Sequence, residues 1–117
     1  VLPPLGTRCV LTIADLARFP RLLPSGEVRW ELHDGVPVPM SPPGYVHGKA
    51  ALKIAAQLLS QGEERGYGEA GDEIAVVLRR NPDRVVGVDA LFVAKASLPA
   101  QLSPEGYLLT IPTLVVE

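Results

Sequence analysis

The sequence predicts an α+β fold, and three observations support this prediction. The chain has 117 residues, which suits one domain with one core. A stretch of helical periodicity from Tyr45 to Arg65 separates a predicted hairpin from several short runs rich in β-branched residues. Helices and strands therefore occur in separate groups along the chain, an order that is typical of α+β domains.

The first predicted element is a short helix from Thr12 to Arg18. The Thr12 side chain can cap its first turn, Asp15 occupies the third helical position, and Pro20 ends it. The residues from Arg21 to Gly26 are predicted to form a loop, because proline, serine and glycine follow one another there.

A hairpin is predicted from Val28 to Met40. Its two extended arms flank Asp34-Gly35, a dipeptide that tolerates the positive φ angles of a tight turn. Pro37 and Pro39 have no backbone N–H group to donate. The second arm is therefore predicted to lie at the edge of the sheet, or partly outside it.

The longest predicted helix runs from Tyr45 to Arg65, and glycines end it. Apolar side chains recur on one face of this helix at a spacing of four residues, with further apolar side chains beside them. The stripe consists of Val46, Ala50, Ile54 and Leu58, flanked by Ala51, Ala55 and Leu59. We expect this stripe to pack against the core.

Three strands are predicted after the long helix. Ile74 to Leu78 and Val85 to Val93 are expected to pair antiparallel across the turn Asn81-Pro82-Asp83, and Leu114 to Glu117 forms the third strand. Because the chain stops in this last strand, residues 1–117 are expected to form a single domain whose C-terminal part is missing.

Composition and charge narrow the classes of function. The net charge of −2 provides no global basic field, so nucleic-acid binding would need a local basic patch. A single cysteine, Cys9, allows no intrachain disulfide and no cysteine-based zinc site, and is expected to be a small apolar side chain. No stretch approaches the roughly 20 apolar residues of a membrane span. No secretory signal opens the sequence either, so we expect a cytoplasmic protein.

Asp89 is the residue whose surroundings are most unusual. It is the one charged side chain in the run Val85 to Val93, which is otherwise apolar. An ionised carboxylate in such surroundings costs several kcal/mol unless it is paired or binds a metal. The alternative is an exposed Asp89 at a strand end, or one that is paired with a nearby arginine such as Arg84.

Glu117 provides a possible partner, because it is the one carboxylate of the last predicted strand. If this strand neighbours that of Asp89, the two backbones lie about 4.8 Å apart, and the carboxylates could share one divalent cation. Mg²⁺ is the natural choice, since it prefers hard oxygen ligands. Such an ion can polarise a phosphoryl oxygen and acidify a bound water.

Glu31 and His47 are further candidates. Alternation along the hairpin arm places Glu31 and His33 on one face, where Glu31 is either solvent-exposed or assists the metal site. His47 lies in the first turn of the long helix, where the positive helix end favours a neutral imidazole. The alternative for His47 is a surface or packing role. Three arginines around the turn at 79–84 could contact phosphates, or form a solvated loop.

Five segments together resemble a known family. They are Trp30-Glu31-Leu32-His33-Asp34-Gly35, Met40-Ser41-Pro42-Pro43, His47 at a helix start, the run from Val88 to Val93, and the run from Pro112 to Glu117. In this order and spacing, the chain resembles the Uma-two family of restriction endonucleases, part of the PD-(D/E)XK nuclease superfamily. The resemblance extends from about Thr12 to the last residue.

The resemblance implies a metal-dependent phosphodiesterase with a restriction-endonuclease-like core, in which an N-terminal hairpin and one long helix pack on a mixed central sheet. In that superfamily an Asp on one strand and a Glu on the next hold Mg²⁺ (or Mn²⁺), and these positions match Asp89 and Glu117. Glu31 matches the hairpin glutamate of the family, and His47 matches its helix-start histidine. These four residues are the expected catalytic set.

Two departures from the family pattern affect this expectation. Val88 replaces the proline that usually precedes the aspartate, which should be tolerated because proline contributes no chemistry. The lysine, or its substitute, that would follow the glutamate lies beyond Glu117, so the third catalytic component is unassigned.

Two hypotheses follow. The first is an Mg²⁺-dependent endonuclease whose substrate is DNA. The second is a catalytically inactive nuclease-fold module that binds DNA or protein and could act as a homodimer. It is motivated by the acidic net charge and the missing lysine.

Overall fold

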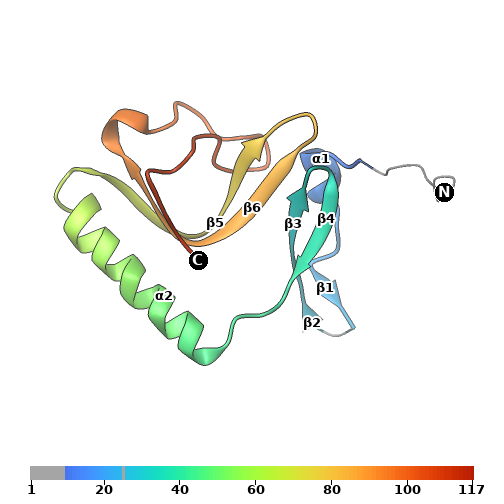
Figure 1. Cartoon of the computed structure of the whole chain (residues 1–117), viewed down its shortest axis with the longest axis horizontal. Coiled ribbons are helices and arrows are strands. Elements are labelled where there is room, and N and C mark those ends of the chain that lie inside the picture. The colour runs from blue at the N-terminus through green and yellow to red at the C-terminus, as the bar shows by residue number, and fades with distance from the viewer. Residues whose placement is uncertain (1–9, 25) are drawn as a thin grey trace, which may run out of the picture.

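The computed structural model of the chain describes residues 10–24 and 26–117. Cys9 lies outside the described residues. Within these residues there are two α-helices and seven strands, together with a π-helical turn (Leu59–Glu63) and a short 3₁₀ helix (Lys95–Ser97). Figure 1 shows how they are arranged. In chain order the α-helices and strands are α1 (Ile13–Leu16), β1 (Leu22–Leu23), β2 (Gly26–Glu27), β3 (Arg29–His33), β4 (Val36–Met40), α2 (Tyr45–Leu58), β5 (Gly68–Arg79), β6 (Arg84–Ala94) and β7 (Leu114–Val116).

The strands form a two-stranded sheet, β1-β2, and a five-stranded sheet with the order β4-β3-β6-β5, in which β7 also pairs with β6. This arrangement confirms the predicted α+β fold. The predicted antiparallel pairing of β5 with β6 is also confirmed. Each named strand pair is antiparallel. The parallel component of the expected mixed sheet is an isolated bridge between Val76 and Leu108.

Local signals in the N-terminal region are confirmed. The Thr12 side chain accepts a hydrogen bond from the Asp15 N–H, and the Asp15 carboxylate accepts one from the Thr12 N–H, which is a complete capping box. The predicted loop from Arg21 to Gly26 contains the short strands β1 and part of β2. The main hairpin turns at Asp34 and Gly35, which have φ angles of 52° and 84°. Strand β4, which carries both prolines, lies at the sheet edge as predicted.

Two clusters of apolar side chains form the core. One lies under α1 and contains Ile13, Leu16, Leu32, Val77 and Val85. The other lies over the centre of β5 and β6 and contains Val76, Val88, Leu91, Val93 and Leu108. Strands β5 and β6 contribute to both clusters. Strand β6 also pairs with β3, β5 and β7, so it is the central strand of the sheet.

The prediction that the stripe on α2 packs into the core is wrong. None of the α2 residues is buried, and the side chains of Val46 and Ile54 are exposed. The half-buried positions are Ala51, Ala55 and Leu58. Helix α2 contacts β5 and β6, and these three positions form a narrower line than the full stripe. Apolar periodicity therefore predicted the helix correctly but overestimated the surface that it buries.

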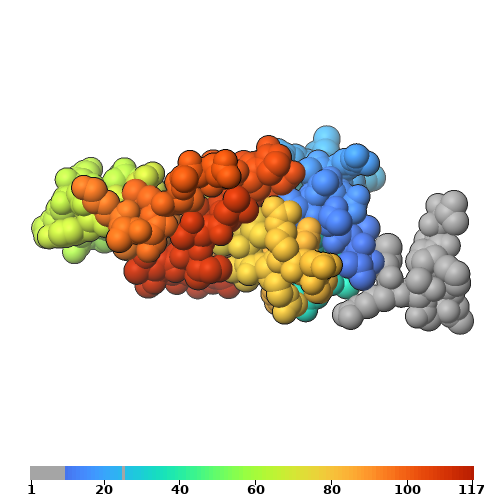
Figure 2. Space-filling view, turned by 90° about the horizontal axis from the view of Figure 1, so that it is seen from above, coloured from blue at the N-terminus to red at the C-terminus, as the bar shows by residue number. Residues whose placement is uncertain are grey.

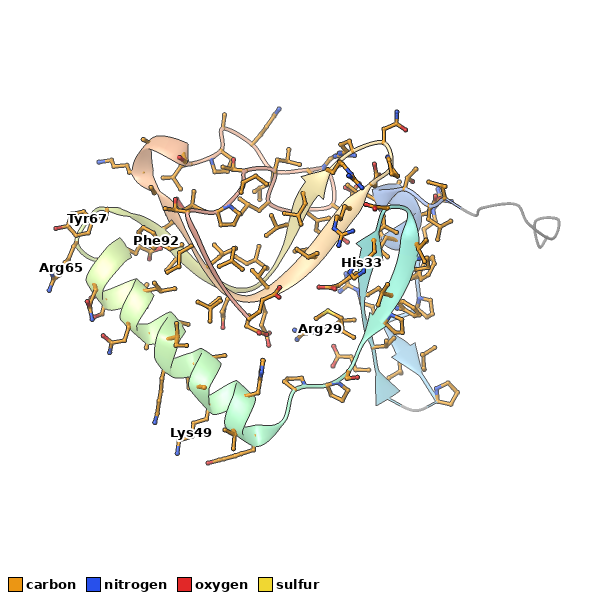
Figure 3. All side chains as sticks on the ribbon, viewed as in Figure 1. Arg29, His33, Lys49, Arg65, Tyr67 and Phe92 are labelled. Atoms are coloured by element: carbon orange, nitrogen blue, oxygen red, sulfur yellow. The ribbon has the colours of Figure 1, made fainter. Side chains whose placement is uncertain are left out.

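The C-terminal end of the helical region makes the close contact with the sheet. Gly62, in the π-helical turn, lies against the ring of Phe92 on β6, where even one added carbon would overlap the ring. Figure 3 shows Phe92 between the sheet and this end of the helix. The helix is thus held close to the sheet at one end, while its first turn lies beside the loop that follows β4.

The other side of β5 and β6 is covered by the segment between β6 and β7. Figure 1 shows this segment and α2 on opposite sides of the two strands, and the view from above in Figure 2 shows it, in orange and red, along the top of the molecule. Leu108 anchors it, since its N–H donates to Ala75 O and its carbonyl accepts from Val77 N–H. Among the described residues, no helix is long and apolar enough to cross a membrane.

Candidate active site

A cleft of about 550 Å³ opens between the first turn of α2, the β3–β4 hairpin and the strands β5 and β6. It is lined by Glu27, Arg29, Glu31, Met40, Ser41, Pro42, Pro43, Gly44, His47, Glu73, Gly87, Asp89 and Glu117. All four residues of the expected catalytic set are in this lining. Their side chains therefore face one space, although they are distant in sequence.

The strand register explains why Asp89 and Glu117 face the same cleft. Ala90 pairs with Val116 across β6 and β7, so the next position along the same register has Asp89 opposite Glu117. Residues directly opposite each other on neighbouring antiparallel strands extend to the same face of the sheet. The strand of Glu117 therefore neighbours that of Asp89, and both carboxylates line the cleft.

His47 is the contact partner of the Asp89 side chain. Its Nε2 atom lies 3.1 Å from Asp89 Oδ2, and the Asp89 side chain is 30% exposed. The alternative in which Arg84 neutralises Asp89 is wrong, because Arg84 Nη1 lies 3.3 Å from Asp34 Oδ1 instead. Helix α2 places His47 in its first turn, next to the loop Ser41–Gly44, so the helix start delivers the imidazole to the sheet.

Glu31 connects β3 to β6 at the edge of the cleft. Its Oε2 atom accepts a hydrogen bond of 2.9 Å from the Gly87 N–H, and its Oε1 atom lies 2.9 Å from His33 Nε2. The Glu31–His33 contact confirms that these side chains share one face of β3. Among the described residues, β3 and β6 pair only at Leu32 and Val85. The Gly87 N–H therefore has the Glu31 carboxylate as its acceptor on β3, in place of a backbone carbonyl. Glu31 thereby fixes the backbone two residues before Asp89.

Arg29 and Glu73 also line the cleft, and sequence reasoning did not identify them as site residues. Arg29 Nη2 lies 3.1 Å from Glu73 Oε2, and this hydrogen bond raises the pKa of the Arg29 guanidinium above its usual value. Figure 3 shows Arg29 pointing away from β3 into the space beside β6. Each residue reads as an ordinary surface charge in the sequence, so no pattern could connect positions 44 residues apart.

The basic turn between β5 and β6 is partly neutralised. Arg79 and Arg84 both contact the Asp34 carboxylate of the hairpin turn. The hydrogen bond from Arg79 lowers the pKa of Asp34 most, and the one from Arg84 contributes further. This ion-pair cluster joins two turns of the sheet and does not belong to the cleft lining. It thus supports the prediction of a solvated loop more than that of a phosphate contact.

The donor set of the cleft fits a hard divalent cation. Within residues 10–24 and 26–117 there is no group of three or more His, Cys, Asp or Glu side chains that could hold a metal ion by themselves. Asp89 and Glu117, however, offer two carboxylates on adjacent strands. Mg²⁺ is commonly held by one or two carboxylates while it keeps several water ligands, so two protein ligands are sufficient.

A hairpin, a long helix and a sheet whose central strand β6 carries Asp89, with Glu117 at the end of the neighbouring strand β7, together fit a restriction-endonuclease-like fold. A comparison with protein-family models supports this class, because residues 15–117 match the Uma2 family, described as "Putative restriction endonuclease". The chain belongs to the Uma2 family and hence to the PD-(D/E)XK nuclease superfamily. Comparisons with curated proteins and with solved structures gave no match.

Proposed function

We propose that this chain is a metal-dependent endonuclease that hydrolyses the phosphodiester bonds of DNA. The observation that supports the proposal most directly is the register that has Asp89 opposite Glu117 at a cleft. Family membership points to nuclease chemistry, and the donor set suits Mg²⁺ or Mn²⁺. A cation bound there would polarise a phosphoryl oxygen and lower the pKa of a bound water.

Each of the four residues has a distinct role in this proposal. Asp89 and Glu117 hold the cation. His47 contacts one oxygen of the Asp89 carboxylate, so it would position this carboxylate and leave the other oxygen available to hold the cation. Glu31 acts as a positioning residue, because both of its oxygens already have protein partners, Gly87 N–H and His33.

A plasmid-nicking assay tests the proposal. We expect the wild-type protein to cleave supercoiled DNA with Mg²⁺ or Mn²⁺ and to be inactive with a chelator. Asp89→Asn and Glu117→Gln should each lose at least about a hundred-fold in rate, because the cation contributes several kcal/mol to transition-state stabilisation. Asp72→Asn is the matched control, since Asp72 is an exposed acid of β5 outside the cleft lining.

Calorimetric titration with Mg²⁺ provides a readout that does not depend on cleavage. Wild-type protein and Asp72→Asn should bind the ion, whereas Asp89→Ala should not. If Asp89→Ala binds Mg²⁺ as well as the wild type does, the assignment of the metal site is wrong. If the wild type binds DNA and never cleaves it, the chain is instead a catalytically inactive DNA-binding module. The predicted cytoplasmic location and homodimer stay predictions.

A further inference from the structure

Arg29 and Glu73 form an ion pair that crosses the cleft. Arg29 belongs to β3 and Glu73 to β5, and β6 lies between these strands in the sheet. A contact of 3.1 Å between their side chains must therefore pass over β6. Both residues line the 550 Å³ cleft together with Gly87 and Asp89, and they also line an adjoining cavity of about 360 Å³. Gly87 has no side chain that could obstruct this crossing.

Glu73 has an unusual backbone conformation for a glutamate. Its φ angle is 50°, in the left-handed region that favours glycine. The pairs on either side, Asp72 with Ala90 and Ile74 with Val88, leave Glu73 at the position that faces Asp89, where the ladder has no pair of its own. Strained backbone of this kind persists only where the surrounding structure holds it, and it is concentrated at functional sites. A carboxylate is thus kept beside the candidate metal ligands at a position where glycine would be less strained.

Arg29 is the one arginine among the cleft-lining residues, which otherwise include five carboxylates. A guanidinium binds a phosphate through two parallel hydrogen bonds, in the same way as it binds a carboxylate. The side chains of Arg29 and Glu73 are 58% and 56% exposed, so their ion pair is weak and can exchange its partner. A DNA phosphate that enters the cleft could therefore replace the Glu73 carboxylate.

We propose that Arg29 binds a phosphate of the DNA strand in the cleft, and that Glu73 is its built-in competitor. In the free protein Glu73 holds the guanidinium over β6. On binding, the phosphate takes the guanidinium and the Glu73 carboxylate is released to solvent. This inference rests on the proposed function, since it assumes that DNA is the molecule that enters the cleft.

The test measures DNA affinity by fluorescence anisotropy of a labelled duplex in a chelator, so that no cleavage interferes. Glu73→Gln and Glu73→Gly should both tighten binding by about five-fold, because a competing exposed ion pair is lost. Arg29→Gln should weaken binding by about ten-fold and lower the salt dependence by about one phosphate contact. In the Arg29→Gln protein, adding Glu73→Gln should raise the DNA affinity by less than two-fold, because there is no longer a guanidinium for which Glu73 could compete.

Asp72→Asn separates this mechanism from general electrostatics. It removes the same charge from the neighbouring residue, and we expect less than a two-fold change in affinity. Comparable tightening by Asp72→Asn and Glu73→Gln would overturn the inference. It would also be overturned if Glu73→Gln abolished Mg²⁺ binding in calorimetry, because Glu73 would then be a metal ligand.

The outcome also distinguishes this inference from the proposed function. A wild-type protein that neither binds nor cleaves DNA overturns both proposals. A wild-type protein that cleaves DNA, but whose Glu73→Gln variant binds it no more tightly, overturns only the competition between Glu73 and phosphate.

Thermal unfolding of Glu73→Gly should show an increased Tm relative to Glu73→Gln, since glycine relieves the positive φ angle.

Discussion

At the scale of single residues, the carboxylates of this chain differ in what neutralises them. Asp89 contacts a histidine, Glu31 accepts a backbone N–H, and Asp34 contacts two arginines. The hydrogen bonds from Arg79 and Arg84 hold the pKa of Asp34 below its usual value. The arginine contacts therefore join the two turns most tightly when Asp34 is ionised.

The lowered pKa of Asp34 predicts how the stability of the fold changes in acid. A carboxyl group whose pKa is lower in the folded state stabilises the fold above its unfolded pKa, and this stabilisation disappears as the pH falls through the folded pKa. We expect urea midpoints to decrease below about pH 4, the ordinary range of an aspartate. Asp34→Asn should be less stable than the wild type at pH 7, and the two proteins should converge at low pH.

Asp15 is a second carboxyl group whose pKa is lowered, mainly by the hydrogen bond from the Thr12 N–H. The urea midpoint of the Asp34→Asn protein should therefore still decrease in acid, but by less than that of the wild type. Equal urea midpoints for the wild type and Asp34→Asn at pH 7 would contradict a stabilising role for the arginine contacts.

The sequence could predict the carboxylates of the site but not their immediate partners. Asp89 and Glu117 are detectable because each is a lone charge in an apolar strand. The partner of Asp89 depends on how the helix start approaches the sheet, which local patterns do not encode. Glu73 is invisible to sequence reasoning for another reason, since its φ angle and its position opposite Asp89 arise from tertiary pairing.

At the scale of elements, two glycines on the helical region have opposite surroundings. Gly48 in α2 has no atom within 4 Å of where a side-chain carbon would be added. Gly62, at the other end, lies directly against the Phe92 ring. The same substitution at the two positions therefore separates helix propensity from packing.

We expect Gly48→Ala to stabilise the protein by up to about 1 kcal/mol, because alanine is the better helix former. Gly62→Ala should destabilise it by about 1–2 kcal/mol, since the overlap with Phe92 outweighs the gain in propensity. Urea denaturation measures both effects. If both variants are stabilised, the close contact between the helical region and β6 is not as the structure has it.

The elements themselves were largely predictable. Turn dipeptides, the capping box and β-branched runs gave the hairpin, α1 and the β5–β6 pair, because these signals act within a few residues. The burial of α2 was not predictable, since periodicity shows which face is apolar and does not show how closely the helix approaches the sheet. The cleft beside the first turn of α2 is the result of that looser approach.

At the scale of the whole molecule, cation binding and stability are linked. Like charges that lie opposite each other on adjacent strands destabilise the fold, so Asp89 and Glu117 oppose folding in the metal-free protein. A cation that binds only the folded state stabilises it, by about 2.7 kcal/mol at a concentration one hundred times the Kd. The proposed site should therefore be unfavourable for stability until it is filled.

This linkage predicts that Mg²⁺ reverses the order of stability of the wild type and Glu117→Gln. In a chelator, Glu117→Gln should be slightly more stable than the wild type, by about 0.5 kcal/mol or less. With excess Mg²⁺ the wild type should become the more stable protein, because the variant cannot use the cation. Thermal unfolding in the two buffers measures both differences. A wild-type Tm that does not respond to Mg²⁺ would contradict the site, and Asp72→Asn serves as the control for removal of a charge.

The limited contact between β3 and β6 has a consequence for how the protein can diversify. These strands pair at Leu32 and Val85, and the Glu31 carboxylate supplies the next link. The β3–β4 hairpin forms one wall of the cleft, whereas the ladders of β5, β6 and β7 carry the opposite carboxylates. Insertions or exchanges in the hairpin can therefore remodel that wall while the strands that carry Asp89 and Glu117 keep their register. In the nuclease that we propose, substrate preference could then change through the hairpin while the proposed metal ligands stay in place.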